Sequence, residues 1–253
     1  MTDARHNNLR EHDVAPLRNV ALFSQLFERV RNVKAGRPVM GGFAGKSGLG
    51  KSTAARHAAA RNSAIYIECG STWREGMIVD SVASELMMPP LKGPIAKKIN
   101  DIIGWLADDP VVLIFDEADH IVLKRNVDVV REISDKARAP VIFIGEENLP
   151  SKLMEFERAH NRILDWGDVV AANLDDAKKL LKVHVDNLVI ADDLLQKIVN
   201  DTDGCARRIV MNFDRVEEFA KRHSLLSLDL RTYKELIYNG MPKRRAAPAR
   251  TTA

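Results

Sequence analysis

The sequence predicts an α/β fold, in which a doubly wound parallel sheet is followed by a small all-helical lid. Apolar, strand-like stretches alternate with helical patterns as far as Ala172, which is typical of a parallel sheet. One of these stretches, Val111–Phe115, is apolar at every position, as expected for a strand buried on both faces. After Ala172 only helical patterns remain, which indicates a separate helical part.

Composition limits the class of protein. The chain has 253 residues, of which 45% are hydrophobic and 29% are charged, as in ordinary soluble globular proteins. No apolar stretch approaches the roughly 20 residues needed to span a bilayer. The polar segment Met1–Asp13 resembles neither a signal peptide nor a transit peptide. With two widely separated cysteines, Cys69 and Cys205, we expect a cytoplasmic protein with reduced thiols and no membrane partner.

Hydrophobic periodicity predicts the helices and strands of residues 1–172. Residues 1–37 are expected to form an N-terminal extension and a leading amphipathic helix over Val14–Arg37. Residues 38–172 form the α/β core, with helices over Trp73–Met88 and Ile95–Ala107. The core strands are expected at Val39–Phe43, Ala64–Cys69, Val111–Phe115, Val141–Gly145 and part of Ile163–Val170.

Residues 173–240 are the expected lid. Its four helices are predicted from Asn173 or Asp175 to Val185, from Ala191 or Asp192 to Asn200, over Arg207–Arg222, and from Asp229 to about Tyr238. Residues 241–253 carry basic side chains and no acid, and we expect this proline-containing tail to be disordered. Such a tail either contacts nucleic-acid phosphates or serves only as a solubilising end.

A phosphate-binding loop lies between the first strand and a helix-forming stretch. Its residues match G-x-x-x-x-G-K-[ST] and continue into the helix: Gly45, Lys46, Ser47, Gly48, Leu49, Gly50, Lys51, Ser52 and Thr53. Backbone N–H groups of such a loop point at phosphate oxygens, and the helix adds its positive N-terminal end. We expect Lys51 to reach the β- and γ-phosphates of ATP, and the Ser52 hydroxyl to bind Mg²⁺.

Two acids end the buried strand Val111–Phe115. The carboxyl ends of parallel strands share one edge of the sheet, so Asp116 and Glu117 are expected beside the phosphate loop. Asp116 suits the Mg²⁺ shell, and Glu117 is placed to polarise an attacking water. A pair of acids capping the next helix is the alternative, and the preceding phosphate loop disfavours it.

A nucleotide core followed by a helical lid resembles the AAA+ ATPases. In that family Gly204–Arg207 corresponds to the start of the sensor 2 helix, whose arginine, here Arg207, reaches the γ-phosphate. The sensor 1 residue would be Asn148 or, as second choice, Glu146. The arginine finger, which completes a neighbouring subunit's site, would be Arg162, with Arg158 as runner-up.

Two segments, Gly145–Pro150 and Arg162–Trp166, also resemble the ATP-binding B proteins of Mu-like transposing phages, relatives of TnsC and IstB. The resemblance implies ATP-dependent assembly into a ring or filament on double-stranded DNA, without sequence preference, and delivery of that DNA to a transposase. It would place the protein in a bacterial host cytoplasm. Mu B carries a helix-turn-helix domain ahead of its core, and fewer than forty residues precede the core here.

DNA binding would then come from the core or from the tail. The basic candidates are Arg74, Lys92, Lys97, Lys98, Lys124, Arg125, Lys243, Arg244 and Arg245. Two other functions stay open, namely a replication-initiation or helicase-loading ATPase, and a signalling or secretion ATPase that binds no DNA. Salt-dependent binding of duplex DNA only with ATP would exclude the last class.

Overall fold

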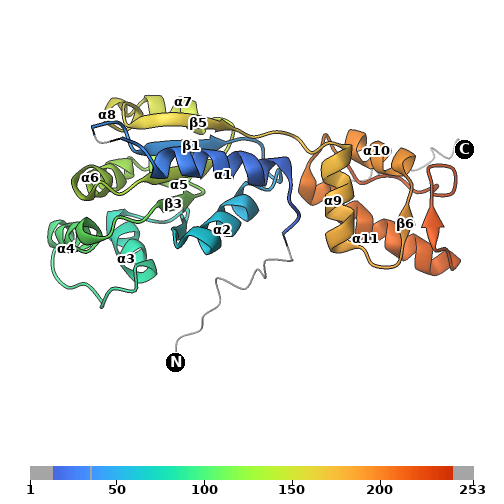
Figure 1. Ribbon diagram of the computed structural model, residues 1–253, viewed down its shortest axis with the longest axis horizontal. Helices are drawn as coiled ribbons and strands as arrows, with labels where there is room; N and C mark the ends of the chain where they lie inside the picture. The colour runs from blue at the N-terminus through green and yellow to red at the C-terminus, as the bar shows by residue number, and fades with distance from the viewer. Residues whose placement is uncertain (1–13, 35, 242–253) are drawn as a thin grey trace, which may run out of the picture.

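A computed structural model describes residues 14–34 and 36–241. The α/β core and the lid lie side by side along the long axis of the molecule, joined by the chain that follows strand β5 (Figure 1). The predicted extension before residue 14 and residues 242–253 of the basic tail, with Lys243, Arg244 and Arg245, lie outside the described residues. Within the described ranges, no helix has the length and apolar character that a membrane crossing requires.

The core is built on a parallel sheet with strand order β2-β3-β4-β1-β5. Its strands are β1 Met40–Ala44, β2 Ile65–Glu68, β3 Leu113–Asp116, β4 Val141–Gly145 and β5 Ile163–Asp168. These strands confirm the five predicted ones to within a few residues. Because the strands are parallel, the loops that follow β1, β3 and β4 lie at the same edge of the sheet. The neighbouring positions of β3, β4 and β1 bring these three loops together.

Helices cover both faces of this sheet. On one face α1 Arg18–Arg31 and α2 Lys51–Asn62 pack with Phe43 and Ile114 of the strands. The other face carries α3 Glu75–Glu85, α4 Ile95–Asp108 and α6 Val127–Ala137. Short helices α5 Asp119–Leu123, α7 Leu149–Met154 and α8 Glu157–His160 complete the core.

Helix α1 is shorter than the predicted span of residues 14–37. It begins only after Pro16, with Leu17 in an extended conformation at its N-cap. It ends at Arg31, ahead of Gly36 and Pro38, which do not continue a helix.

The lid contains α9 Leu174–His184, α10 Asp192–Asp201 and α11 Ala206–His223 around a core of its own. The expectation of an all-helical lid is wrong in one detail. Two short strands, β6 Val189–Ile190 and β7 Ser227–Leu228, form a parallel pair.

The helix predicted from Asp229 to about Tyr238 is also wrong. The Asp229 carboxylate accepts hydrogen bonds from the N–H groups of Arg231 (3.1 Å) and Thr232 (2.8 Å), which makes a tight turn instead. Further on, the side chain of buried Asn212 pairs with both the N–H (2.8 Å) and the C=O (2.9 Å) of Tyr238. Side-chain hydrogen bonds of Asp229 and of Asn212 on α11 therefore replace the helical hydrogen bonds of this segment.

The close packing of β1, the strand that leads into the phosphate loop, can be tested at Gly42. A Cβ atom at Gly42 would lie 2.1 Å from the ring of Trp166 on β5, whereas a Cβ at Gly104 in α4 meets nothing within 4 Å. We expect Gly42→Ala to lower the free energy of unfolding by about 1–3 kcal/mol through overpacking. The matched Gly104→Ala should raise it by roughly 0.5–1 kcal/mol through helix propensity. Urea unfolding followed by circular dichroism measures both, and equal effects would contradict the described packing.

Candidate nucleotide-binding site

The phosphate loop connects β1 to α2. Gly48 and Gly50 have φ of +81° and +88°, in the left-handed region that favours glycine. Gly50 is the N-cap residue of α2, so the positive end of this helix faces the loop. The Lys51 Nζ donates to the carbonyl oxygens of Gly45 (2.6 Å) and Lys46 (2.9 Å). Burial lowers the pKa of Lys51, and the carboxylates of the neighbouring strand end oppose this shift.

The acids that follow β3 lie beside this loop. Asp116 is only 3% exposed, and its carboxylate accepts hydrogen bonds from the Tyr66 hydroxyl (2.5 Å) and the Glu117 N–H (2.8 Å). Glu117 has a φ of +53°, a strained conformation for a residue other than glycine, and strain of this kind clusters at functional sites. Burial and the Asp116 carboxylate raise the pKa of Glu117. A base of higher pKa accepts a proton more readily near neutral pH.

Tyr66 was not singled out by the sequence, although it fixes Asp116. Burial and the Asp116 carboxylate raise the pKa of the Tyr66 phenol, which therefore stays protonated and donates. The Arg56 guanidinium lies 5.0 Å from the centre of the Tyr66 ring and forms an ion pair with Glu68 (2.7 Å). The only sequence signal was a tyrosine on the strand that pairs with β3.

Asp119 is the second residue that sequence reasoning missed. It is 4% exposed and accepts hydrogen bonds from the Glu146 N–H (2.7 Å) and the Lys152 Nζ (2.6 Å). A Cβ at Gly145 would lie 2.2 Å from its Oδ2 atom, so the glycine permits this approach. Asp119 thus ties the turn after β3 to the end of β4, where the sensor 1 residue was predicted.

The structure separates the two sensor 1 candidates. Glu146 follows β4 directly and lines the cavity described below, whereas Asn148 is the exposed N-cap residue of α7 and is not among the lining residues. Arg207, the sensor 2 candidate, lines the same cavity. Its backbone N–H donates to the carbonyl oxygen of Gly48 (3.1 Å), so helix α11 of the lid contacts the phosphate loop directly. The roles of these three residues stay predictions.

A cavity of about 490 Å³ lies between core and lid. Its polar side contains the phosphate loop together with Asp116, Glu117 and Glu146. The apolar side chains around it come from the segment at the start of α1 and from the lid: Ala15, Leu17, Val20, Leu180, Val210 and Met211. Cavities of roughly 300–1,000 Å³ hold small molecules. Such a cavity suits a nucleotide. Its base would lie among the apolar side chains, and its phosphates would bind the hydrogen-bond donors of the phosphate loop.

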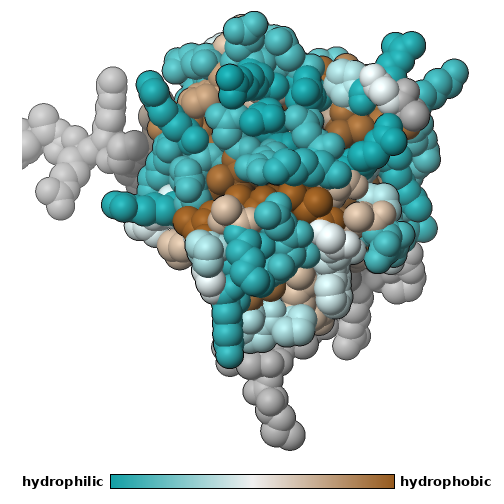
Figure 2. All heavy atoms as spheres, turned by 90° about the vertical axis from the view of Figure 1, so that its left-hand side faces the viewer, coloured by the Kyte–Doolittle hydropathy of each residue, from teal (hydrophilic) through white to brown (hydrophobic). Residues whose placement is uncertain are grey.

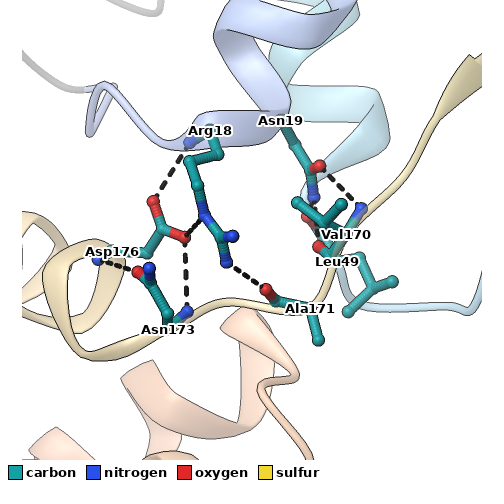
Figure 3. Close-up of polar contacts among 7 residues, drawn as sticks. All are labelled: Arg18, Asn19, Leu49, Val170, Ala171, Asn173 and Asp176. Carbon is teal, nitrogen blue, oxygen red and sulfur yellow. Dashed lines mark hydrogen bonds and ion pairs between the residues drawn. The ribbon is translucent and has the colours of Figure 1, made fainter.

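The side chain of Asn19 joins the phosphate loop to the connection between core and lid (Figure 3). Its Nδ2 donates to the carbonyl oxygens of Leu49 and Val170, both at 2.8 Å, and its Oδ1 accepts from the Val170 N–H (3.0 Å). Asn19 is only 5% exposed, so these bonds are shielded from water.

Arg18 extends this network into the lid (Figure 3). Its backbone N–H (3.0 Å) and its Nε (2.8 Å) donate to the carboxylate of Asp176, and its guanidinium also donates to the carbonyl of Ala171 (2.5 Å). Asp176 is 2% exposed and forms a capping box with Asn173 at the start of α9. We call Arg18, Asn19 and Asp176, with their hydrogen-bond partners, the lid clamp.

The two candidates for the arginine finger lie far from the cavity between core and lid. Arg162 immediately precedes β5, so it lies at the edge where the parallel strands begin, opposite the phosphate loop. Its Nε contacts Asp135 at 2.8 Å. Arg158, on α8, is exposed. Neither arginine can complete the site of its own molecule from this edge.

The basic core residues that were predicted as DNA contacts are scattered over the surface. Arg74, Lys92, Lys124 and Arg125 are exposed, whereas Lys97 and Lys98 form ion pairs with Asp101 (2.6 Å) and Asp80 (2.8 Å). Together they make no defined site in the described residues.

The lid clamp gives a prediction about stability. Arg18→Ala leaves the buried Asp176 carboxylate without its charged partner, and we expect it to lower the free energy of unfolding by roughly 1–3 kcal/mol. The control is Lys178→Ala, which removes an exposed ion pair with Asp192 and should cost at most about 0.5 kcal/mol. Chemical denaturation measures both. Equal costs would show that the buried pair does not hold the lid.

Comparisons with known proteins agree with this fold. Residues 39–153 match the family model described as an AAA domain. No curated protein sequence matches the chain. Among similar solved structures is Cdc6p from Pyrobaculum aerophilum, with 17% identity and a TM-score of 0.63 over 89% of this chain and 66% of that one.

Two structures from Aeropyrum pernix are also similar. The ORC2 protein, in ADPNP-ADP complexes, has 15% identity and a TM-score of 0.67 over 87% of this chain and 68% of that one. The ORC1 protein in complex with DNA has 14% identity and a TM-score of 0.61 over 83% and 62%. The chain thus spans about two thirds of the length of these proteins. It has the α/β fold of the AAA+ P-loop NTPases, and its residues 39–153 match the AAA domain model.

Proposed function

We propose that this chain is an AAA+ ATPase that binds and hydrolyses ATP and acts on duplex DNA in the manner of replication-initiation ATPases. The observation that carries the proposal is the shared cavity that joins the phosphate loop, Asp116, Glu117 and the lid residue Arg207. The similar structures support both parts of the proposal, because one holds ADPNP and ADP and another is in complex with DNA.

The phosphate loop and its helix supply the binding energy for the phosphates. The N-terminal end of α2 and the ammonium group of Lys51 attract the phosphate oxygens. Ser52 and Asp116 offer the hydroxyl and carboxylate oxygens that Mg²⁺ prefers, and bound Mg²⁺ would neutralise phosphate charge. Tyr66 and the Glu117 N–H hold the Asp116 carboxylate in one orientation.

Hydrolysis needs a base beside the phosphates and cations that stabilise the transition state. Glu117 is the base in this proposal, because its raised pKa favours proton acceptance from water. Arg207 contributes positive charge from the lid, and Glu146 or Asn148 orients the water. Arg162 acts on the site of a neighbouring molecule, so the nucleotide state controls self-assembly.

DNA transposition is the second candidate function. It is favoured by the likeness of Gly145–Pro150 and Arg162–Trp166 to the Mu B group, and it implies capture of target DNA without sequence preference for a transposase. Stimulation of ATP hydrolysis by a transposase would favour this function. Preference for an origin sequence, or loading of a helicase, would favour replication initiation. A signalling ATPase would bind no DNA.

The nucleotide site is tested by two substitutions. Lys51→Ala removes the phosphate-binding ammonium and should abolish binding of ATP. Glu117→Gln keeps the size of the side chain but removes the base, so ATP should still bind while hydrolysis falls at least about a hundredfold, as expected when a general base is removed. Equilibrium binding of a fluorescent ATP analogue and phosphate release measure the two effects.

The DNA part is tested on the same variants. With ATP present, the stalled Glu117→Gln protein should retain duplex DNA at low salt, whereas Lys51→Ala should not. Binding should weaken steeply with salt, because phosphate contacts dominate binding that lacks sequence preference. Near-normal hydrolysis by Glu117→Gln would remove Glu117 as the base. A stalled protein that binds ATP but no DNA would leave an ATPase with another client.

A further inference from the structure

A second cavity, of about 600 Å³, lies at the edge of the sheet where the strands begin. Its walls come from the segments that precede β1, β3, β4 and β5. Figure 2 views the molecule from this end, and it shows a band of hydrophobic surface between hydrophilic side chains. The cavity is separated from the nucleotide site by the length of the sheet. Of its lining residues, only Arg162, the proposed finger for a neighbouring site, takes part in the proposed ATPase chemistry.

Positive charge gathers around this cavity. Five cationic side chains line it, namely Arg31, Lys34, Arg37, Arg138 and Arg162. Asp135 is the one carboxylate among the described lining residues, and it already accepts from Arg131 (3.1 Å) and Arg162 (2.8 Å).

Most of this charge is not compensated. In the described part of the chain, Lys34, Arg37 and Arg138 form no ion pair, and all three are exposed. Arg31 has only a long contact of 3.9 Å with Glu28. An anion entering the cavity therefore meets cations that have few competing partners.

The remaining walls favour phosphate over a peptide. Pro38, Pro110 and Pro140 line the cavity and carry no N–H group, so at these positions the backbone cannot donate to a partner's main chain. Val33 and Val39 add apolar surface. Recognition then depends on side-chain cations, and the planar guanidinium fork of arginine matches the geometry of phosphate oxygens.

We propose that this cavity binds the phosphodiester backbone of duplex DNA. The choice of DNA as the source of the phosphates rests on the proposed function, whereas the affinity for phosphate rests on the cations of the cavity. Because the cavity lies at the opposite edge from the phosphate loop, DNA and ATP bind without competing. Arg162, which borders the cavity and contacts Asp135, brings the DNA site next to the predicted contact with a neighbouring subunit.

The test removes two cations that have no place in the nucleotide site. Arg138 has a φ of +56°, so we replace it by asparagine, which tolerates this conformation, in the double variant Arg37→Gln/Arg138→Asn. Binding to a labelled duplex of arbitrary sequence is followed by fluorescence anisotropy at several salt concentrations, with a non-hydrolysable ATP analogue. The slope of log affinity against log salt should become shallower by about 0.9 for each DNA phosphate that the variant no longer neutralises.

Two controls separate a local effect from net charge. Lys182→Gln/Lys234→Gln removes the same charge from exposed lid positions and should leave the slope unchanged. Arg37→Lys/Arg138→Lys keeps the charge and should keep most of the slope. Circular dichroism and binding of the ATP analogue confirm that each variant folds.

Three outcomes overturn the proposal. An unchanged slope and affinity in Arg37→Gln/Arg138→Asn would show that the cavity contacts no DNA. Loss of ATP-dependent self-association in sedimentation, with DNA binding intact, would make the cavity a contact between subunits. Absence of DNA binding by the unaltered chain would remove this site together with the DNA part of the proposed function, whereas the first two outcomes leave that function standing.

Discussion

The buried amide of Asn19 joins three segments that are far apart in the sequence. Its hydrogen bonds hold the start of α1, the carbonyl of Leu49 in the phosphate loop, and both polar groups of the Val170 backbone. A buried amide without these partners would bear the full cost of desolvation, so the arrangement is specific. Because the lid follows Val170 within a few residues, this one side chain sets where the lid begins relative to the loop.

The rest of the candidate site depends on this placement. Arg18 and Asp176 continue the clamp into α9, and the Arg207 N–H brings the start of α11 against Gly48. Gly204 precedes this contact with a φ of +64°, and a Cβ there would lie 2.5 Å from the carbonyl oxygen of Ala172. The cavity therefore exists only while core and lid keep this arrangement. A ligand that contacts both parts stabilises it by mass action.

Sequence patterns predicted the features that are contiguous in the chain. The phosphate loop, the acids after β3 and the five strands are local signals, each set by the residue types of one short segment. The predicted helix after Asp229 failed because two side chains, Asp229 and Asn212, offer the backbone partners that a helix would have used.

The supporting residues of the site could not be predicted in this way. Tyr66 meets Asp116, Asp119 meets the end of β4, and Arg18 meets Asp176 only after folding. In the sequence each looks like an ordinary strand or helix residue. Their roles come from pairs separated by 50, 27 and 158 positions, which no local pattern encodes.

We infer that the clamp at Asn19 builds the proposed nucleotide site from core and lid together. Equilibrium titration of a fluorescent ATP analogue into Asn19→Ala tests it most directly. The control is Asn32→Ala, which removes only an exposed contact with Glu28 at the end of α1. We predict that Asn19→Ala stays folded but binds the analogue at least about tenfold more weakly, since tenfold corresponds to about 1.4 kcal/mol. Equal affinity in the two variants would show that the clamp does not shape this site.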